Sequence, residues 1–134
     1  KTIRRLLMMK RLRPQKTAKQ LADRAGRRAE NWAVWLLRAK AYSIVTRNYK
    51  RPMGEIDIIA RRGRVLVFVE VKYRHHRDAA IASVTPRQWM RIARAAQDFT
   101  TRNAGFRKLV WRFDMVVCAP RLMPRHIADC WRMR

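Results

Sequence analysis

The chain has 134 residues, which is enough for one domain around one hydrophobic core. It carries 33 Lys and Arg against nine Asp and Glu, a formal net charge of +24. Hydrophobic residues still make up 49% of the chain, which excludes a disordered basic tail for most of its length. No apolar run approaches the ~18 residues of a membrane-spanning helix, so no membrane partner is expected.

The excess of positive charge predicts a polyanionic partner. Each phosphate that a basic side chain neutralises releases a counterion, so a strongly basic surface binds nucleic acid without reading its sequence. The two cysteines, Cys118 and Cys130, show neither a CxxC pattern nor a His at metal-site spacing. We therefore expect no disulfide framework and no structural zinc, and reduced thiols favour a cytoplasmic location.

The first twenty residues are predicted to lie outside the domain. Residues 1–20 contain eight Lys or Arg, no acidic residue, and a proline at position 14. A charge run of this kind predicts a mobile basic arm. Residues 21–134 are then predicted to form the domain.

The first predicted element of the domain is a helix from Gln20 to about Lys40, because apolar residues recur there at helical spacing. Trp32 lies on that apolar stripe and is expected to be buried. Glu30 lies on the neighbouring face, four residues after Gly26, which we expect to allow a close backbone approach. An acidic residue bordered by a glycine and apolar side chains is unusual for a solvated surface.

Three strands are predicted next, over residues 42–49, 55–60 and 65–72. A polar loop leads to a second helix, in which Thr85 is expected to be the N-cap and Gln88 its capping-box partner. Trp89 lies on the buried stripe of this helix. A strand over residues 109–117 and a short last element over 126–131 complete the chain. The fold class is therefore α/β, with three layers, a mixed central sheet and the order α-β-β-β-α-β.

The hairpin between the second and third strands decides whether the acidic residues meet. A loop of either two or four residues pairs Asp57 with Phe68. Side chains alternate between faces, so Asp57, Glu70 and Lys72 then share one side of the sheet, and Glu55 lies directly opposite Glu70. A three-residue loop would place Asp57 on the other side from Glu70.

This set of residues has the chemistry of a metal site. Two carboxylates on neighbouring strands, Asp57 and Glu70, can share one Mg²⁺ or Mn²⁺, whereas without a cation such close like charges repel. Lys72 could position a water for attack on phosphorus, or help to deprotonate it. Glu30 would add a third acid, at a second metal or a metal-bound water. The alternative is that Glu70 and Lys72 form a solvent-exposed ion pair on an amphipathic strand.

Several motifs of the chain closely resemble the YraN-like family of small bacterial proteins. The resemblance covers roughly residues 24–131 and includes Gly26-x₃-Glu30, Arg47-Asn48, Gly54-Glu55-Ile56-Asp57, Val67-Phe68-Val69-Glu70-Val71-Lys72-x-Arg74 and Arg112-Phe113-Asp114. That family is similar to the PD-(D/E)xK nuclease superfamily, whose restriction-endonuclease-like core also occurs in archaeal Holliday-junction resolvases. The resemblance implies that Asp57 and Glu70 are metal ligands, Lys72 the catalytic lysine and Glu30 the helix-borne acid.

The function expected from the residues and the resemblance together is a metal-dependent nuclease. It would hydrolyse phosphodiester bonds in DNA, on branched or single-stranded structures, with Mg²⁺ or Mn²⁺ as cofactor. The side chains expected to hold phosphates are Arg74, Arg87, Arg91 and Arg94, although an arginine row is also typical of a solvated helix face. The alternative is a non-catalytic nucleic-acid-binding protein that retains the nuclease fold. A homodimer is a further expectation from the resemblance, with no residue pattern that marks its interface.

Overall fold

The computed structural model describes residues 17–133. The helices are α2 (Ala18–Ala39), α3 (Arg77–Ala82) and α4 (Pro86–Arg102), with a short 3-10 helix η1 (Ala104–Phe106). The strands are β1 (Ser43–Arg51), β2 (Gly54–Arg62), β3 (Val65–Tyr73), β4 (Val110–Cys118) and β5 (Arg125–Trp131). The first sixteen residues of the expected basic arm lie outside the described part, and residues 18–20 belong to α2.

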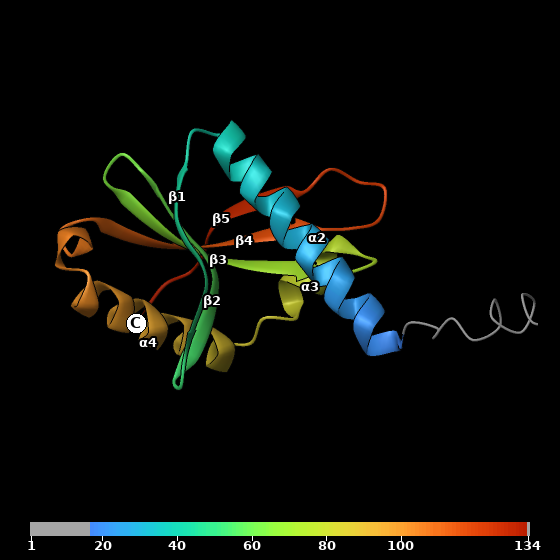
Figure 1. Cartoon of the computed structure of the whole chain (residues 1–134), viewed down its shortest axis with the longest axis horizontal. Coiled ribbons are helices and arrows are strands. Elements are labelled where there is room, and N and C mark those ends of the chain that lie inside the picture. Colours follow the sequence, from blue (N-terminus) through green and yellow to red (C-terminus); the bar gives the residue numbers. More distant parts are fainter. Residues whose placement is uncertain (1–16, 134) are drawn as a thin grey trace, which may run out of the picture.

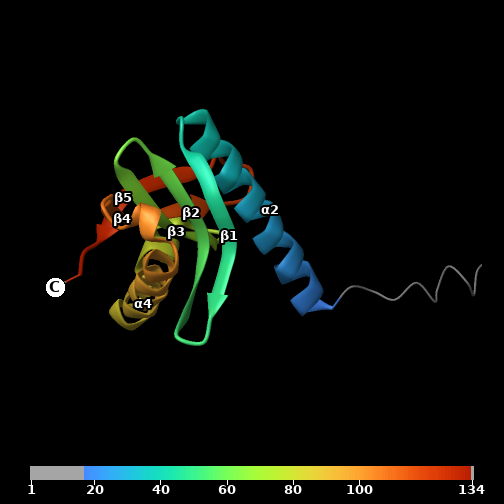
Figure 2. The same ribbon diagram turned by 60° about the vertical axis from the view of Figure 1, so that its left-hand side comes forward.

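The five strands form one mixed sheet in the order β1-β2-β3-β4-β5. β3 and β4 run parallel, and every other neighbouring pair is antiparallel. Helix α2 covers one face of the sheet and α4 covers the other (Figures 1 and 2). The predicted α/β class is confirmed. Helix α3 forms where the sequence predicts a loop, and the predicted short last element is the strand β5. Over residues 17–133, no helix has the length and apolar character needed to cross a membrane.

Each long helix begins at a threonine cap. Thr17 accepts from the Gln20 amide, and the Gln20 side chain accepts from the Thr17 amide, which completes a capping box. Thr85 likewise accepts from the Gln88 amide, and Pro86 occupies the first turn of α4. The predicted capping-box role of the Gln88 side chain is wrong, because that side chain donates to Glu70 instead.

Apolar side chains pack on both faces of the sheet. On the α4 side, Phe68 and Trp89 belong to one buried cluster. On the α2 side, Leu37 and Val69 belong to a second cluster. The prediction for Trp89 is confirmed, but that for Trp32 is wrong, because Trp32 is 51% exposed. A helix with apolar residues around much of its circumference leaves some of them outside the core when it contacts the sheet along one stripe.

The β2–β3 hairpin closes through Gly63, which has a positive φ of 60°. Arg62 pairs with Val65, and Ile59 pairs with Phe68. The predicted pairing of Asp57 with Phe68, and with it the placing of Glu55 opposite Glu70, is therefore wrong by two residues. Because side chains alternate with a period of two, this shift does not change which residues share a face.

Gly54 and Gly26 differ in what surrounds them. A Cβ at Gly54 would lie 2.2 Å from the main-chain oxygen of Arg91, so only glycine lets the start of β2 approach α4 so closely. A Cβ at Gly26 would meet no atom within 4 Å. The expectation of a close backbone approach at Gly26 is thus wrong, and the glycine that requires one is Gly54.

Strand β5 is held to β4 through a buried carboxylate. Asp114 is fully buried and accepts from Arg112 Nε at 2.9 Å and Nη2 at 2.8 Å, and from the Asp129 amide at 2.9 Å. Its Oδ2 also lies 2.6 Å from His126 Nε2. Burial opposes ionisation of Asp114, but the bonds from His126 and Arg112 prevail and lower its pKa to about 2. The group therefore has a structural role at the edge of the sheet.

Candidate active site

The site begins where β2 and β3 separate. The two strands pair as far as Ile58 and Val69, and toward its start β2 then turns away from β3 together with β1 (Figure 1). Beyond this point, the Asp57 carboxylate accepts a hydrogen bond of 2.8 Å from the Val71 amide. The side chain thus supplies an acceptor where the strands no longer pair, as a part-buried amide requires. Asp57 is held in the fork between the strands.

Two hollows open from this fork, one on each side of the sheet. The first, of about 310 Å³, lies between β2 and α4 and is lined by Glu55, Asp57, Glu70, Gln88, Arg91 and Ile92. The second, of about 560 Å³, lies on the α2 side, and its lining includes Gly26, Glu30, Asn48, Lys50, Asp57 and Val71. Asp57 lines both hollows, so a group bound in either one reaches the same carboxylate.

The carboxyl groups of Asp57 and Glu70 are close enough to change each other's pKa. Glu70 is only 8% exposed, and its pKa is raised to about 7 by burial and by the neighbouring charge of Asp57. Burial also raises the pKa of Asp57, although the Val71 amide opposes this rise. A hydrogen bond between the two carboxyl groups further raises the pKa of Glu70, as expected when such a pair shares one proton. A bound cation would relieve the repulsion between them.

Lys72 lies beside this pair, as predicted. Its Nζ is 3.2 Å from Glu70 Oε1, and its side chain is only 17% exposed. The ammonium group lowers the pKa of Glu70, but by less than burial and Asp57 raise it. The alternative of a solvent-exposed ion pair is therefore wrong, since the side chains of Lys72 and Glu70 are only 17% and 10% exposed.

Gln88 is a site residue that the sequence did not reveal. Its Nε2 donates to Glu70 Oε1 at 3.3 Å, and Gln88 lines the same hollow as Glu70. The Thr85 cap uses the main-chain amide of Gln88, which leaves the side chain free to enter the hollow. The capping-box pattern therefore led to a wrong assignment for the Gln88 side chain. The one sequence signal for its contact with Glu70 is its position in the first turn of α4.

Glu30 lies on the α2 side of Asp57, away from Glu70. Its Oε1 accepts from Arg47 Nε at 3.2 Å and from Asn48 Nδ2 at 2.9 Å. Asn48 has a positive φ of 53°, a conformation that asparagine tolerates better than most residues. The charge of Glu30 raises the pKa of Asp57, so the two groups are electrostatically linked. Glu30 thus faces the second hollow and does not complete a set of three ligands with Glu70.

The donor set fits a hard divalent cation. Among residues 17–133, no three His, Cys, Asp or Glu side chains are gathered closely enough to hold a metal by themselves. Mg²⁺ does not need such a cage, because it keeps several waters and binds through one or two carboxylates plus substrate phosphates. Asp57 and Glu70 supply two carboxylates at the edge of an open hollow, and their raised pKa values fit a cation as the missing partner.

Only one of the four arginines expected to bind phosphate lines the first hollow. Arg91 does so, with its Nε 3.4 Å from the Met53 carbonyl. Arg87 and Arg94 are exposed on α4 and line neither hollow. Arg74 directly follows β3, where its Nη1 donates to the Tyr73 carbonyl at 2.8 Å. Of these four arginines, Arg91 is therefore the one that shares a hollow with Asp57 and Glu70.

Comparisons with known proteins agree on one family. The family model described as "Uncharacterised protein family UPF0102" matches residues 29–118, which include Glu30, Asp57, Glu70 and Lys72. A UPF0102 protein of Parvibaculum lavamentivorans is 51% identical over 111 residues, covering 83% of this chain and 84% of the relative. One of Paramagnetospirillum magneticum is 45% identical, covering 90% and 96%. One of Caulobacter vibrioides is 44% identical, covering 82% and 88%.

Proposed function

We propose that this chain, which belongs to the uncharacterised protein family UPF0102, is a metal-dependent nuclease that hydrolyses phosphodiester bonds in DNA. The proposal includes a restriction-endonuclease-like core of the PD-(D/E)xK type, similar to that of archaeal Holliday-junction resolvases. One observation carries it. The carboxyl groups of Asp57 and the buried Glu70 line one open hollow, with the Lys72 ammonium 3.2 Å from Glu70.

The residues that line the hollow, together with the adjacent Lys72, would each have a separate role in hydrolysis. Asp57 and Glu70 would hold Mg²⁺ or Mn²⁺, which when bound supplies positive charge at the scissile phosphate and a more acidic water. Lys72 lies where its ammonium group can orient an attacking water and offset the negative charge that develops on phosphorus. Gln88 fixes Glu70 through its amide. Arg91, exposed on the rim, would hold a neighbouring phosphate.

The proposed substrate class rests on two features: the net positive charge of the chain, and the lack of an element that reads bases among the residues named above. Phosphate contacts by arginines position a nucleic acid without specifying its sequence. We therefore propose selection by DNA structure, with branched or single-stranded regions as substrates. A homodimer would let two such sites act on a branched molecule.

Cleavage of defined DNAs tests the proposal. Purified full-length chain is incubated with linear, flapped and four-way DNA, with Mg²⁺, with Mn²⁺ or with chelator. We expect cutting that requires the metal and falls about 100-fold or more in Asp57→Ala and in Lys72→Ala. Asp78→Asn and Lys108→Ala are matched controls, because these exposed residues line neither hollow, and both should cut like the unmodified chain.

Two results would contradict the nuclease. Equal cutting by the unmodified chain and both site variants would identify a contaminating enzyme. Binding of DNA with no cutting under any metal would favour the alternative, a nucleic-acid-binding protein that keeps the fold without the chemistry.

A further inference from the structure

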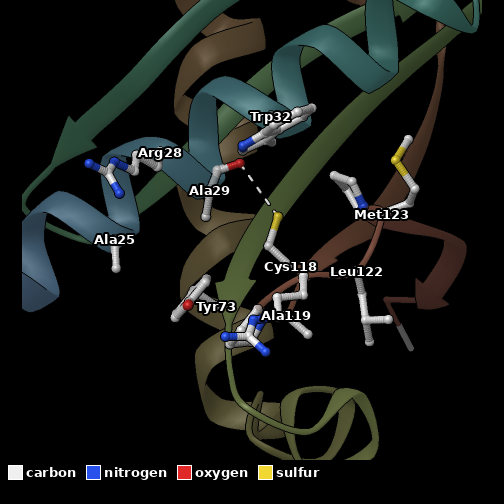
Figure 3. A pocket seen from close by; sticks show the side chains of 12 residues that line it. Ala25, Arg28, Ala29, Trp32, Tyr73, Cys118, Ala119, Leu122 and Met123 are labelled. Atoms are coloured by element: carbon white, nitrogen blue, oxygen red, sulfur yellow. Dashed lines mark hydrogen bonds between the residues drawn. The ribbon is translucent and has the colours of Figure 1, made fainter.

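We propose that the pocket between α2 and the loop after β4 binds an unpaired base of single-stranded DNA next to the strand that is cut. This inference rests on the proposed function, because it assigns the substrate's single-stranded part to a defined place. The pocket has a volume of about 480 Å³ and a mainly apolar lining of twelve residues, of which Trp32, Tyr73, Cys118, Leu122 and Met123 carry the argument (Figure 3).

The pocket presents aromatic and apolar surface to solvent. Trp32 is 51% exposed on α2, and across the opening Leu122 and Met123 are 56% and 60% exposed. Figure 3 shows Trp32 on one side of the pocket and Tyr73 on another, with Met123 facing them from the loop. An exposed apolar patch that is bordered by polar residues is typical of a binding site. Indole and phenol rings are also the groups on which unstacked bases lie.

The positive charge around the pocket favours an anionic ligand. Arg28 and Arg121 are among its lining residues, and none of the twelve is acidic. Arg74 is exposed immediately after Tyr73. Apolar faces bordered by guanidinium groups complement a single strand, whose bases are flat and apolar and whose backbone is anionic.

The position of the pocket connects it to the candidate active site. Val71 lines the hollow that contains Asp57, and Tyr73 lines the pocket. Both side chains lie on the α2 face of β3, two residues and therefore ~7 Å apart. That distance is short enough for one nucleic-acid strand to reach both places. A strand that crosses α2 can thus place a phosphate near Asp57 and a nearby base against Trp32.

The walls of the pocket are held before any ligand arrives. Cys118 Sγ lies 3.6 Å from the Ala29 carbonyl oxygen, which joins the end of β4 to α2 (Figure 3). Arg77 Nη2 donates to the Met123 carbonyl at 2.6 Å, which ties the loop to α3. A pocket that is already formed loses little conformational entropy when it binds a base.

Binding measurements test this subsite separately from cleavage. The affinity of the full-length chain for a single-stranded oligodeoxynucleotide and for a blunt duplex is measured in chelator, over a series of salt concentrations. We expect Trp32→Ala to weaken single-strand binding about tenfold, to leave duplex binding unchanged, and to leave the salt dependence unchanged because no charge is removed. Trp32→Phe should restore most of the affinity, since it keeps an aromatic face.

Trp35→Ala is the matched control. Trp35 lies on the same helix with 52% exposure and contacts Trp32 edge-on, but it does not line the pocket, so its removal should leave binding unchanged. Equal losses in the two alanine variants, no loss in Trp32→Ala, or the same loss on duplex would overturn the subsite. So would a change in self-association of Trp32→Ala by sedimentation, since the pocket would then bind a second copy.

The subsite and the nuclease can fail independently. A Trp32-dependent preference for single strands, together with no metal-dependent cutting, would support the subsite and contradict the nuclease. Metal-dependent cutting with no Trp32 effect on binding would support the nuclease and overturn the subsite.

Discussion

The carboxylate of Asp57 accepts a hydrogen bond from the main-chain amide of Val71, 2.8 Å away, at the point where β2 separates from β3. One side chain therefore joins two strands that no longer pair, and at the same time lines the hollows on both sides of the sheet. The structural bond and the proposed metal-binding role depend on the same carboxyl group. Substitutions that keep one and remove the other can separate them.

Asp57→Asn should keep the fold but bind a divalent cation more weakly than the unmodified chain does. The asparagine carbonyl can still accept from Val71, but it carries no charge for a cation. Asp57→Leu removes the acceptor as well and should lower the free energy of unfolding by about 1–3 kcal/mol, the cost of an unsatisfied amide. Denaturant unfolding and calorimetric titration with Mn²⁺ measure the two effects. Similar stability of the two variants would show that the Val71 bond contributes little.

Glu70→Gln should stabilise the metal-free protein at pH 8. The pKa of Glu70 is raised from 4.5 to about 7 in the folded state, so the folded chain holds this proton more tightly than the unfolded chain. That contribution is fully present below pH 4.5 and is lost as the pH rises through about 7. Glutamine cannot ionise, so the variant does not lose this stability as the pH rises. We expect the free energy of unfolding of Glu70→Gln to exceed that of the unmodified chain by on the order of 2 kcal/mol at pH 8, and to equal it at pH 4. A lower stability at pH 8 would contradict burial of an ionised Glu70.

Metal affinity should rise with pH in the unmodified chain. Below pH 7 a cation must displace the proton of Glu70, whose pKa is about 7, so the dissociation constant should increase about tenfold for each unit of decrease. Above pH 8 the affinity should level off. Titration with Mn²⁺ at several pH values gives this profile, and a pH-independent affinity would place the cation away from Glu70.

Asp114→Asn should be strongly destabilising. The substitution removes the buried charge that pairs with Arg112 and His126, and breaking such a pair costs about 3–5 kcal/mol. In the unmodified chain the pKa is lowered from 3.8 to about 2, so the stabilisation is present above pH 3.8 and is lost as the pH falls through about 2. Asp129→Asn is the control, since that carboxylate forms an exposed pair with Arg132 and should change stability by less than about 1 kcal/mol.

Alanine at the two glycines should have opposite effects. Gly54→Ala places a Cβ against the main chain of Arg91 and should cost about 1–3 kcal/mol, because β2 or α4 must move. Gly26→Ala meets no neighbour and lies within α2, so it should stabilise by about 0.5–1 kcal/mol. Thermal unfolding of both variants checks the pair. A stable Gly54→Ala would mean that the approach of β2 to α4 is not tight.

The alternation of residues along the strands was enough to place Asp57, Glu70 and Lys72 together. The predicted hairpin register was wrong by two residues, yet the three side chains still converge, because any even shift preserves the face. The α/β class, the four principal strands and the two long helices likewise follow from periodicity and caps, which are local properties of the chain.

The contacts between segments that are distant in the sequence became known only from the tertiary structure. The exposure of Trp32, the entry of Gln88 into the hollow and the close approach at Gly54 each depend on where a helix lies against the sheet. The separation of Glu30 from Glu70 by Asp57 depends on the same packing. Local sequence determines the period of an element and the face on which a residue lies. The angle and distance at which two elements meet are set by packing over the whole core, which no single segment encodes.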